Sequence, residues 1–517
     1  MAVRPGAEHA GMWSRQRGRA RQSGWGRRQR WGGRGRMDRL RPGGPTAPAR
    51  EDDEGKRVNE GKRVNEGKRV KTRRNRGRVV AAALAAMCAA AVLPGRAHAA
   101  DPGEYGFDPG AKKVQGATAN VEASELDEGV PYRSTIRPGE KLYYRVVLDD
   151  VSNAYVSAVA VPGGSGPVAY GDGIKVSLRE TDDTSCGSEQ ANFGSGEYAR
   201  PITAYAYRTI EEGAASCQES GQYDVLVERE TKDATDTRAW DLELRFLREP
   251  RLKAASAMPT KAPENWPSGT PGPLAGQQQK RSGGSGYAQA TSLENGRWQD
   301  TVAPGQTRFY RVPVGWGQQI HATAGLSNST GAAGEFVGSA LTLSLANPAQ
   351  GFVSDATLAY SGSPASASLS PLPPVAYRNR YDSSTQVNAM RFAGWYYLAV
   401  SLSPKLKESF GAEPIPFELS VQVKNEAEES PYEGDAGVFG VTDQDREVAR
   451  KGQNAEQAAK SGPMKVVAAA GIGTGTVLVL GLGVWTLLAR RRTAAAAPAA
   501  PASGAAGPGG HGPPQGR

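Results

Sequence analysis

Four short segments in which apolar and polar residues alternate occur twice along this chain, in the same order. The first copies lie at 138–146, 174–178, 221–227 and 240–246, and the second copies at 304–312, 341–345, 394–400 and 417–423. The offset between copies drifts from 166 to 177 residues, much longer than the period of about 20–50 residues of a solenoid. The repeat therefore predicts two tandem copies of one domain.

Alternation with a period of two is typical of β-strands, because it places one set of side chains on a buried face and the other in water. Turn-forming Pro-Gly pairs, at Pro138 and Pro304, open the first segment of each copy and come just before its expected strand. A sheet with one apolar face must bury it against another layer. We therefore predict an all-β fold with two antiparallel, jelly-roll-like β-sandwiches, at 117–248 and 287–425.

A run of 24 uncharged residues, 466–489, predicts a transmembrane helix. At about 1.5 Å per residue it is long enough for the ~30 Å hydrocarbon core of a bilayer. Three arginines follow at 490–492, and such clusters stay on the cytoplasmic side. We expect a single pass with the C-terminus inside and a disordered cytoplasmic tail at 490–517.

A secretory signal peptide is predicted at 71–99. Its parts are a basic segment, an apolar run too short to span a membrane, and a small-x-small site at Ala97 and Ala99. Cleavage there would start the mature chain at Ala100 or the following residue. A lipoprotein site at Cys88 is the alternative.

The basic charge of the chain lies at its two ends. The whole chain has a formal charge of +10, but 100–462 contains 33 basic and 45 acidic residues. An acidic ectodomain disfavours polyanions, so we expect no nucleic-acid partner. The basic, low-complexity stretch 1–70 cannot bury a core. It is either an arm or a region upstream of the true translation start.

Two cysteines, Cys186 and Cys217, belong to the exported part. A disulfide is the expected state of such a pair outside the cytoplasm. Its stabilisation would be roughly 3–4 kcal/mol in the loop-entropy model. A reactive or metal-binding thiol pair is the alternative.

The aromatic pair after each Pro-Gly turn and the later Gly-x-Tyr motif resemble the bacterial pre-peptidase C-terminal domain. The residues that carry the resemblance are Tyr143, Tyr144, Phe309, Tyr310, Gly221, Tyr223, Gly394 and Tyr396. The resemblance implies a non-catalytic jelly-roll-like sandwich that accompanies exported hydrolases or adhesins. Some relatives bind calcium, but no matching ligand set occurs here, so no cofactor is expected. An acidic residue often found before the aromatic pair is replaced by Leu142 and Arg308.

The ectodomain contains one histidine, His321, in a segment where Ile320 and Ala322 would face the core. We expect His321 to face solvent, and a Ser-His-Asp site would have no other histidine to use. The sequence thus predicts a protein that is not an enzyme. Paired carboxylates at 149–150 and 182–183 leave a glycan hydrolase open, although such pairs are also typical of turns.

Two tryptophans near expected loops, Trp298 and Trp316, have two interpretations: a carbohydrate-binding surface or caps on the sandwich core. Pro- and Gly-rich residues 249–286 predict a linker, and polar residues 426–465 a stalk above the membrane.

The spacing of Gly471 and Gly475 would permit close pairing of two membrane helices, although such glycines are common there, so we do not expect a homodimer. These features together predict a single-pass plasma-membrane protein of a bacterial envelope with an extracellular ectodomain. Its expected role is to bind a cell-wall polymer or an exported protein. The alternatives are an accessory subunit of an exported protease or secretion complex, and a carboxylate-dependent glycan hydrolase.

Overall fold

The computed structural model describes residues 104–460, except 165–167, 212, 232–235, 254–260, 270, 273 and 330–334, together with the single residue Val484. Several predictions therefore lie outside the described residues: the arm, the signal peptide with Ala97, Ala99 and Ala100, the membrane helix with Gly471 and Gly475, and the tail. Of the helices in the described part, none is long and apolar enough to cross a membrane.

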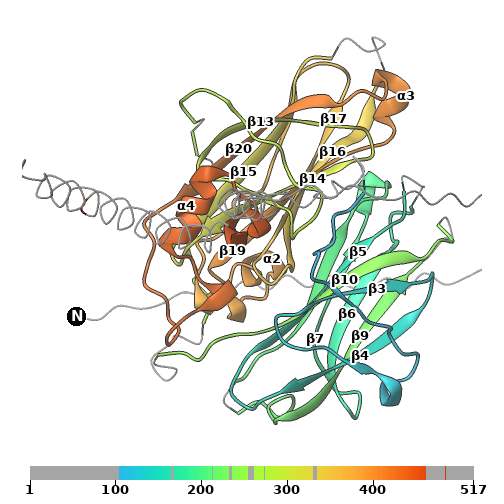
Figure 1. Ribbon diagram of the computed structural model, residues 1–517, viewed down its shortest axis with the longest axis vertical. Coiled ribbons are helices and arrows are strands. Elements are labelled where there is room, and N and C mark those ends of the chain that lie inside the picture. The colour runs from blue at the N-terminus through green and yellow to red at the C-terminus, as the bar shows by residue number, and fades with distance from the viewer. Residues whose placement is uncertain are drawn as a thin grey trace, which may run out of the picture. The chain divides into compact units, whose positions relative to one another are not determined.

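The first sandwich consists of two five-stranded sheets, here called A and B. In order of pairing, sheet A contains β1 (Lys112–Lys113), β3 (Pro131–Ile136), β10 (Trp240–Arg248), β5 (Ala154–Val161) and β8 (Ile202–Arg208). Sheet B contains β2 (Ser124–Glu125), β4 (Lys141–Leu148), β9 (Gly221–Glu230), β6 (Gly173–Glu180) and β7 (Ser185–Asn192). In Figure 1 these strands are coloured blue to green.

The second sandwich consists of sheets C and D. Sheet C contains β11 (Gln279–Lys280), β13 (Gly296–Val302), β20 (Ile415–Lys424), β15 (Gln319–Leu326) and β18 (Ala365–Ser368). Sheet D contains β12 (Thr291–Ser292), β14 (Thr307–Val314), β19 (Gly394–Leu402), β16 (Val337–Ala346) and β17 (Phe352–Tyr360). The labelled helices are η1 (Asn120–Glu122), η2 (Gly194–Gly196), η4 (Tyr377–Tyr381), α2 (Thr385–Asn388), α3 (Leu406–Phe410), η5 (Gly437–Phe439) and α4 (Asp443–Lys451), and residues 455–460 are helical as well.

The strand order of the first sandwich is repeated, strand for strand, in the second. In both, eight longer strands form two antiparallel sheets in the order of a jelly roll. The prediction of two tandem β-sandwiches is confirmed, and each pair of repeated sequence segments falls on equivalent strands. The prediction of purely antiparallel pairing is wrong in one detail, because the two-residue strands β1, β2, β11 and β12 pair in parallel.

The alternating residues form the cores as expected. In β4 the side chains of Leu142, Tyr144, Val146 and Leu148 are buried between the sheets. Burial of each such side chain contributes about 1.5–3 kcal/mol relative to exposure. In a strand such as β4, the alternation in the sequence therefore predicts which side chains lie in the core.

The outer faces of sheets A and D, expected to meet water, pack against each other. Strand β5 is buried along almost its whole length. Its Val159 belongs to a small apolar cluster with Phe309 of β14 and Ala399 of β19. A strand covered on both faces has a nearly continuous apolar sequence, as the β5 sequence AYVSAVAV does.

The buried carboxylate of Glu249 connects the two sandwiches. It directly follows β10 and is 2% exposed. Arg380 of η4 donates two hydrogen bonds to it, Nη1 to Oε2 at 2.9 Å and Nη2 to Oε1 at 2.6 Å. The other donors are the Asn153 amide at 2.7 Å, the Tyr155 hydroxyl at 2.9 Å and the Tyr432 hydroxyl. Burial alone would raise the pKa of Glu249, but the Arg380 charge and these hydrogen bonds outweigh it and lower the pKa.

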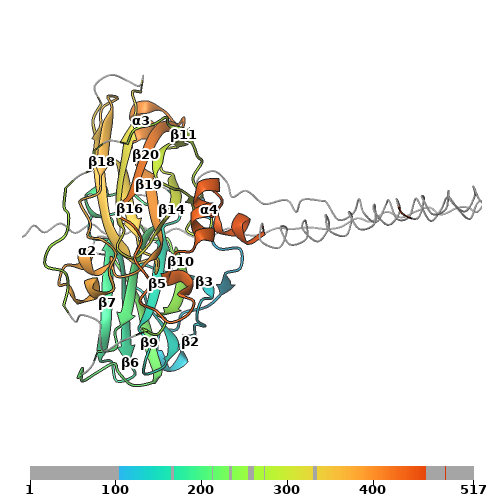
Figure 2. The same ribbon diagram turned by 90° about the vertical axis from the view of Figure 1, so that its left-hand side faces the viewer.

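Residues 428–451 of the segment predicted as a polar stalk pack against the protein, so the prediction of a stalk is wrong for these residues. Tyr432 and Phe439 are fully buried, and α4 begins with a capping box formed by Thr442 and Asp445. The Trp395 indole on β19 donates to Asp445 at 3.1 Å, and Figure 2 shows α4 beside β14. We name residues 428–451 the C-terminal strap. Its few apolar residues are dispersed among charged ones, which is why its composition suggested a stalk.

The start of the predicted linker also belongs to this junction. Leu252 pairs with Tyr432 through an isolated antiparallel bridge. The Lys253 amide donates to the Pro431 carbonyl at 2.9 Å. Residues 249–253 and the strap thus hold each other in place.

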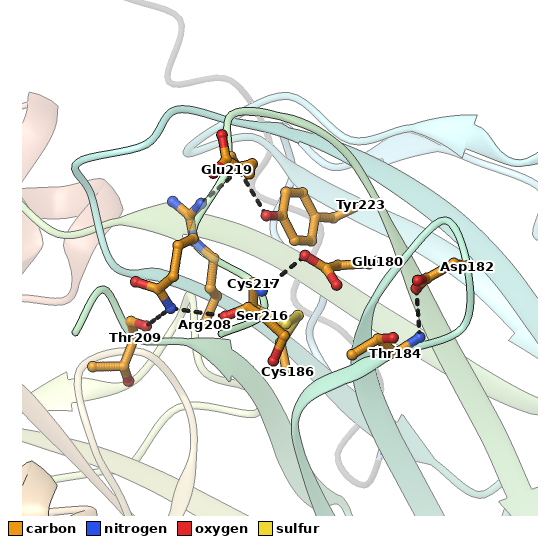
Figure 3. The surroundings of a disulfide bond; sticks show 11 residues. Glu180, Asp182, Thr184, Cys186, Arg208, Thr209, Ser216, Cys217, Glu219 and Tyr223 are labelled. Atoms are coloured by element: carbon orange, nitrogen blue, oxygen red, sulfur yellow. Dashed lines mark hydrogen bonds between the residues drawn. A yellow bond between two sulfur atoms is a disulfide. The ribbon is translucent and has the colours of Figure 1, made fainter. Parts of the chain in front are cut away.

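The predicted disulfide between Cys186 and Cys217 is confirmed, with a Cα–Cα distance of 5.6 Å. It links β7 to the loop between β8 and β9, as Figure 3 shows. The Cys217 amide donates to Glu180 at 2.8 Å. Nearby, the buried guanidinium of Arg208 lies over the Tyr223 ring at 5.4 Å.

Replacing Glu249 by glutamine should lower the free energy of unfolding by about 3–5 kcal/mol at pH 7, because it leaves the Arg380 charge buried without its partner. Urea denaturation of the full-length chain measures this. The pKa of Glu249 is lowered in the folded protein. Its contribution is therefore present above the ordinary glutamate pKa of about 4.3 and is lost as the pH falls through the lowered value.

The control is Glu418→Gln, which breaks a partly exposed pair with Arg297 at 2.7 Å and should cost less than about 1 kcal/mol. Equal losses in the two variants would contradict the role given to Glu249.

Replacing both Cys186 and Cys217 by serine should lower the free energy of unfolding by roughly 3–4 kcal/mol, because the unfolded chain gains the entropy of an open 31-residue loop. Reduction of the wild type should reproduce the loss in the same denaturation assay. An unchanged midpoint would show that the loop is ordered by other contacts.

Candidate functional site

His321 lies where the sequence placed it, on β15 with Ile320 and Ala322 in the core. It is half-buried, and burial together with the Lys424 charge lowers its pKa. It lines a cavity of about 360 Å³ that also contains the Arg297–Glu418 pair. That carboxylate is already occupied by its arginine, so the cavity offers little to a ligand.

The hypothesis that Trp298 and Trp316 form a ligand surface is wrong, because these side chains are only 2% and 5% exposed. The Trp298 indole donates to the Glu294 carbonyl at 3.2 Å. Trp316 packs edge-on against Tyr432 of the C-terminal strap, with ring centres 5.5 Å apart. Both rings belong to the core of the second sandwich, in agreement with the other interpretation.

The candidate carboxylate pairs lie in turns. Asp149 accepts hydrogen bonds from the Val151 and Ser152 amides at 3.0 and 2.6 Å. Asp182 accepts one from the Thr184 amide at 2.9 Å. These carboxylates stabilise local backbone, as side chains of this type commonly do.

A larger cavity, of about 520 Å³, lies where the two sandwiches meet. We name it the junction pocket. The first sandwich lines it with the end of β7, the β7–β8 loop and the start of β8, and the second sandwich with parts of β16, β17 and β19. This site could not be predicted from the sequence, because its walls come from segments about 150 residues apart.

Two exposed aromatic rings line the junction pocket, one from each sandwich. Tyr170 lies in the β5–β6 loop and is 62% exposed, and Phe352 begins β17 and is 38% exposed. Large apolar side chains that remain accessible beside a cavity are typical of binding sites. Sequence reasoning missed both, since only the tertiary structure separates them from the many buried aromatic residues.

A guanidinium and a carboxylate line the same pocket. Arg200 is buried, donates to the Phe193 carbonyl at 2.9 Å and lies over the Tyr198 ring at 5.2 Å. Asp355 lies on β17, opposite Ser344 of β16. The surroundings desolvate this carboxylate and raise its pKa, although the Arg200 charge acts in the opposite direction. Among the described residues, no cation forms an ion pair with Asp355.

The pocket wall from the first sandwich is fixed to the second. The Tyr198 hydroxyl is buried, 2.8 Å from the Thr342 hydroxyl on β16 and 3.1 Å from the Ser401 carbonyl on β19. The β7–β8 loop therefore has a defined place on sheet D, and the shape of the pocket does not depend on a free loop.

The chemistry of the junction pocket suits an uncharged ligand rich in hydroxyl groups. Asp355 accepts hydrogen bonds, Arg200 donates them, and the exposed rings offer faces for stacking. Within the described part of the chain, no three His, Cys, Asp or Glu side chains are placed to hold a metal ion.

No family model and no curated protein matches this chain. The likeness to the pre-peptidase C-terminal domain therefore stays a hypothesis.

Similar solved structures include a tandem CBM22 fragment of Paenibacillus barcinonensis Xyn10C, with 13% identity, 65% of this chain and 100% of that chain covered, and a TM-score of 0.16. Tripeptidyl peptidase 2 has 7% identity, with 58% of this chain and 24% of that chain covered and a TM-score of 0.17. The tandem CBM51 modules of Streptococcus pneumoniae Sp3GH98 have 8% identity, with 55% of this chain and 83% of that chain covered and a TM-score of 0.15. At these scores the likenesses carry no argument about function.

Proposed function

We propose that this protein is a membrane-anchored, non-enzymatic binding protein of the cell surface that holds a cell-wall polysaccharide in the junction pocket. The observation that carries the proposal is the composition of that pocket. One cavity, built by both sandwiches, is lined by two exposed aromatic rings. It is also lined by the Asp355 carboxylate, which forms no ion pair within the described residues, and by the buried Arg200.

A sugar ring has both an apolar face and hydroxyl groups, and the junction pocket offers partners for each. Their C–H faces stack on aromatic side chains, and their hydroxyl groups hydrogen-bond to groups such as Asp355 and Arg200. The volume of about 520 Å³ falls within the range of about 300–1,000 Å³ that is usual for ligand pockets.

A binding role agrees better with the pocket than a glycan hydrolase does. Hydrolysis by the usual mechanisms needs two carboxylates roughly 5–10 Å apart across the scissile bond. Asp355 is the one carboxylate among the described residues that line the junction pocket. The alternative of an accessory subunit for an exported protease has no comparable feature in its favour.

The proposed location rests on the sequence. The predicted signal peptide at 71–99 and the apolar segment at 466–489 favour export followed by anchoring. Only 14 residues separate Lys451, the last residue of α4, from that apolar segment. In this arrangement the pocket is presented to polymers of the wall next to the membrane.

Replacing Tyr170 or Phe352 by alanine should weaken binding to purified peptidoglycan sacculi roughly tenfold each, the equivalent of about 1.4 kcal/mol of lost stacking. Co-sedimentation of the full-length chain with the sacculi measures the affinity. The control is Phe336→Ala, which removes a ring that is 72% exposed and lines no part of the pocket. Unchanged binding by both pocket variants would contradict the proposal.

The affinity should also depend on pH through Asp355. Since the pKa of this carboxyl is raised, binding that needs the ionised form should weaken on acidification, with a midpoint above the ordinary aspartate value of about 3.9. Asp355→Asn should bind less tightly at neutral pH and lose this dependence, whereas Asp150→Asn, in an exposed turn, should behave as wild type. If binding by Asp355→Asn still weakened on acidification with the same midpoint, the pH dependence would belong to another group.

A further inference from the structure

A second cavity, of about 440 Å³, lies next to the junction pocket. We name it the flanking pocket. The two cavities share Arg200 and Pro201 as lining residues. They therefore lie on either side of one short ridge, formed by residues 199–201 of the β7–β8 loop.

The ridge has a fixed position. Directly before it, Tyr198 is held by the hydrogen-bond contacts to Thr342 and Ser401 described above. Directly after it, β8 begins and pairs with β5 from Ile202 opposite Ala160. The spacing between the two cavities is thus set by the packing of sheet A on sheet D, so one rigid ligand could meet both.

The flanking pocket repeats the chemistry of the junction pocket. Phe107 lines it as a half-buried ring, with the Arg133 guanidinium 4.0 Å from the ring centre. The exposed Glu104 supplies a carboxylate, whereas Asp241, which also lines the cavity, is paired with Arg133 at 2.9 Å. The turn after β5 contributes Gly163 and Gly164, and Gly164 has a φ of +77° that favours glycine.

The top of the ridge is suited to a ligand that crosses it. Pro201 has no backbone N–H that would need a partner, and its ring is partly exposed. Arg200 lines both cavities, so this residue borders any chain that passes from one to the other.

We infer that the flanking pocket is a second subsite for the same polysaccharide, so that the protein binds an internal stretch of an extended chain across the ridge. This inference rests on the proposed function and names its ligand more closely. The second contact of a bound chain is intramolecular and acts at a high effective concentration. Affinity should therefore increase with chain length until both cavities are filled.

The test uses glycan strands released from the same peptidoglycan sacculi and separated by length, from two to eight sugar units. Titration calorimetry with the full-length chain should show an affinity that increases at least tenfold over this range. Phe107→Ala should weaken binding of eight-unit strands about fivefold and leave two-unit strands unchanged, whereas Tyr170→Ala should weaken binding at every length. Phe336→Ala is again the matched control.

Phe107 contacts Arg133 and Tyr105, so a second variant guards against a folding effect. Glu104→Gln changes an exposed carboxylate of the flanking pocket and should also weaken only the long strands. Affinity independent of length, with Phe107→Ala and Glu104→Gln neutral but Tyr170→Ala impaired, would overturn the second subsite and leave the proposed function standing. Absence of binding at every length would overturn the proposed function itself, and the second subsite with it.

Discussion

The ion pair between Glu249 and Arg380 is the interaction on which the rest of this structure depends. A carboxylate without water is costly, and only the arginine and three further hydrogen-bond donors make its burial tolerable. These donors come from the first sandwich, the second sandwich and the C-terminal strap. The charge can therefore be satisfied only when all three parts are in place, which couples them into one unit and gives the junction pocket its two walls.

The duplication explains the two folds but not their junction. At the end of β10, the buried Glu249 carboxylate accepts hydrogen bonds from the Asn153 amide and the Arg380 guanidinium. At the end of β20, the Asn425 carbonyl accepts a hydrogen bond from the Gln318 amide at 3.1 Å in an exposed site. The buried charge at the junction thus belongs to the first copy, and the described end of β20 carries a neutral link instead.

Much of the fold could be predicted from the sequence because its causes are local. Alternation in segments such as 141–148 determines which side chains face the core. The two cysteines of the region predicted to be exported have no third cysteine there to pair with. The junction could not be predicted, because Glu249 and Arg380 are 131 residues apart and each looks like an ordinary charged residue of a loop. The same holds for the strap, whose buried Tyr432 is surrounded by polar residues. All four of Tyr170, Phe352, Trp298 and Trp316 are aromatic residues of the sequence, and only the tertiary contacts decide that the first two are exposed and the last two buried.

The central claim is that a buried ion pair holds the two sandwiches in one fixed relation and so forms the pocket. Spin labels at two exposed positions, Val147→Cys on β4 and Ser366→Cys on β18, allow pulsed electron resonance to measure the distance between the sandwiches in the full-length chain. A single narrow distance distribution that becomes broad when Glu249→Gln is added would support the claim. A distribution that is already broad in the presence of Glu249, or one that the substitution leaves unchanged, would contradict it.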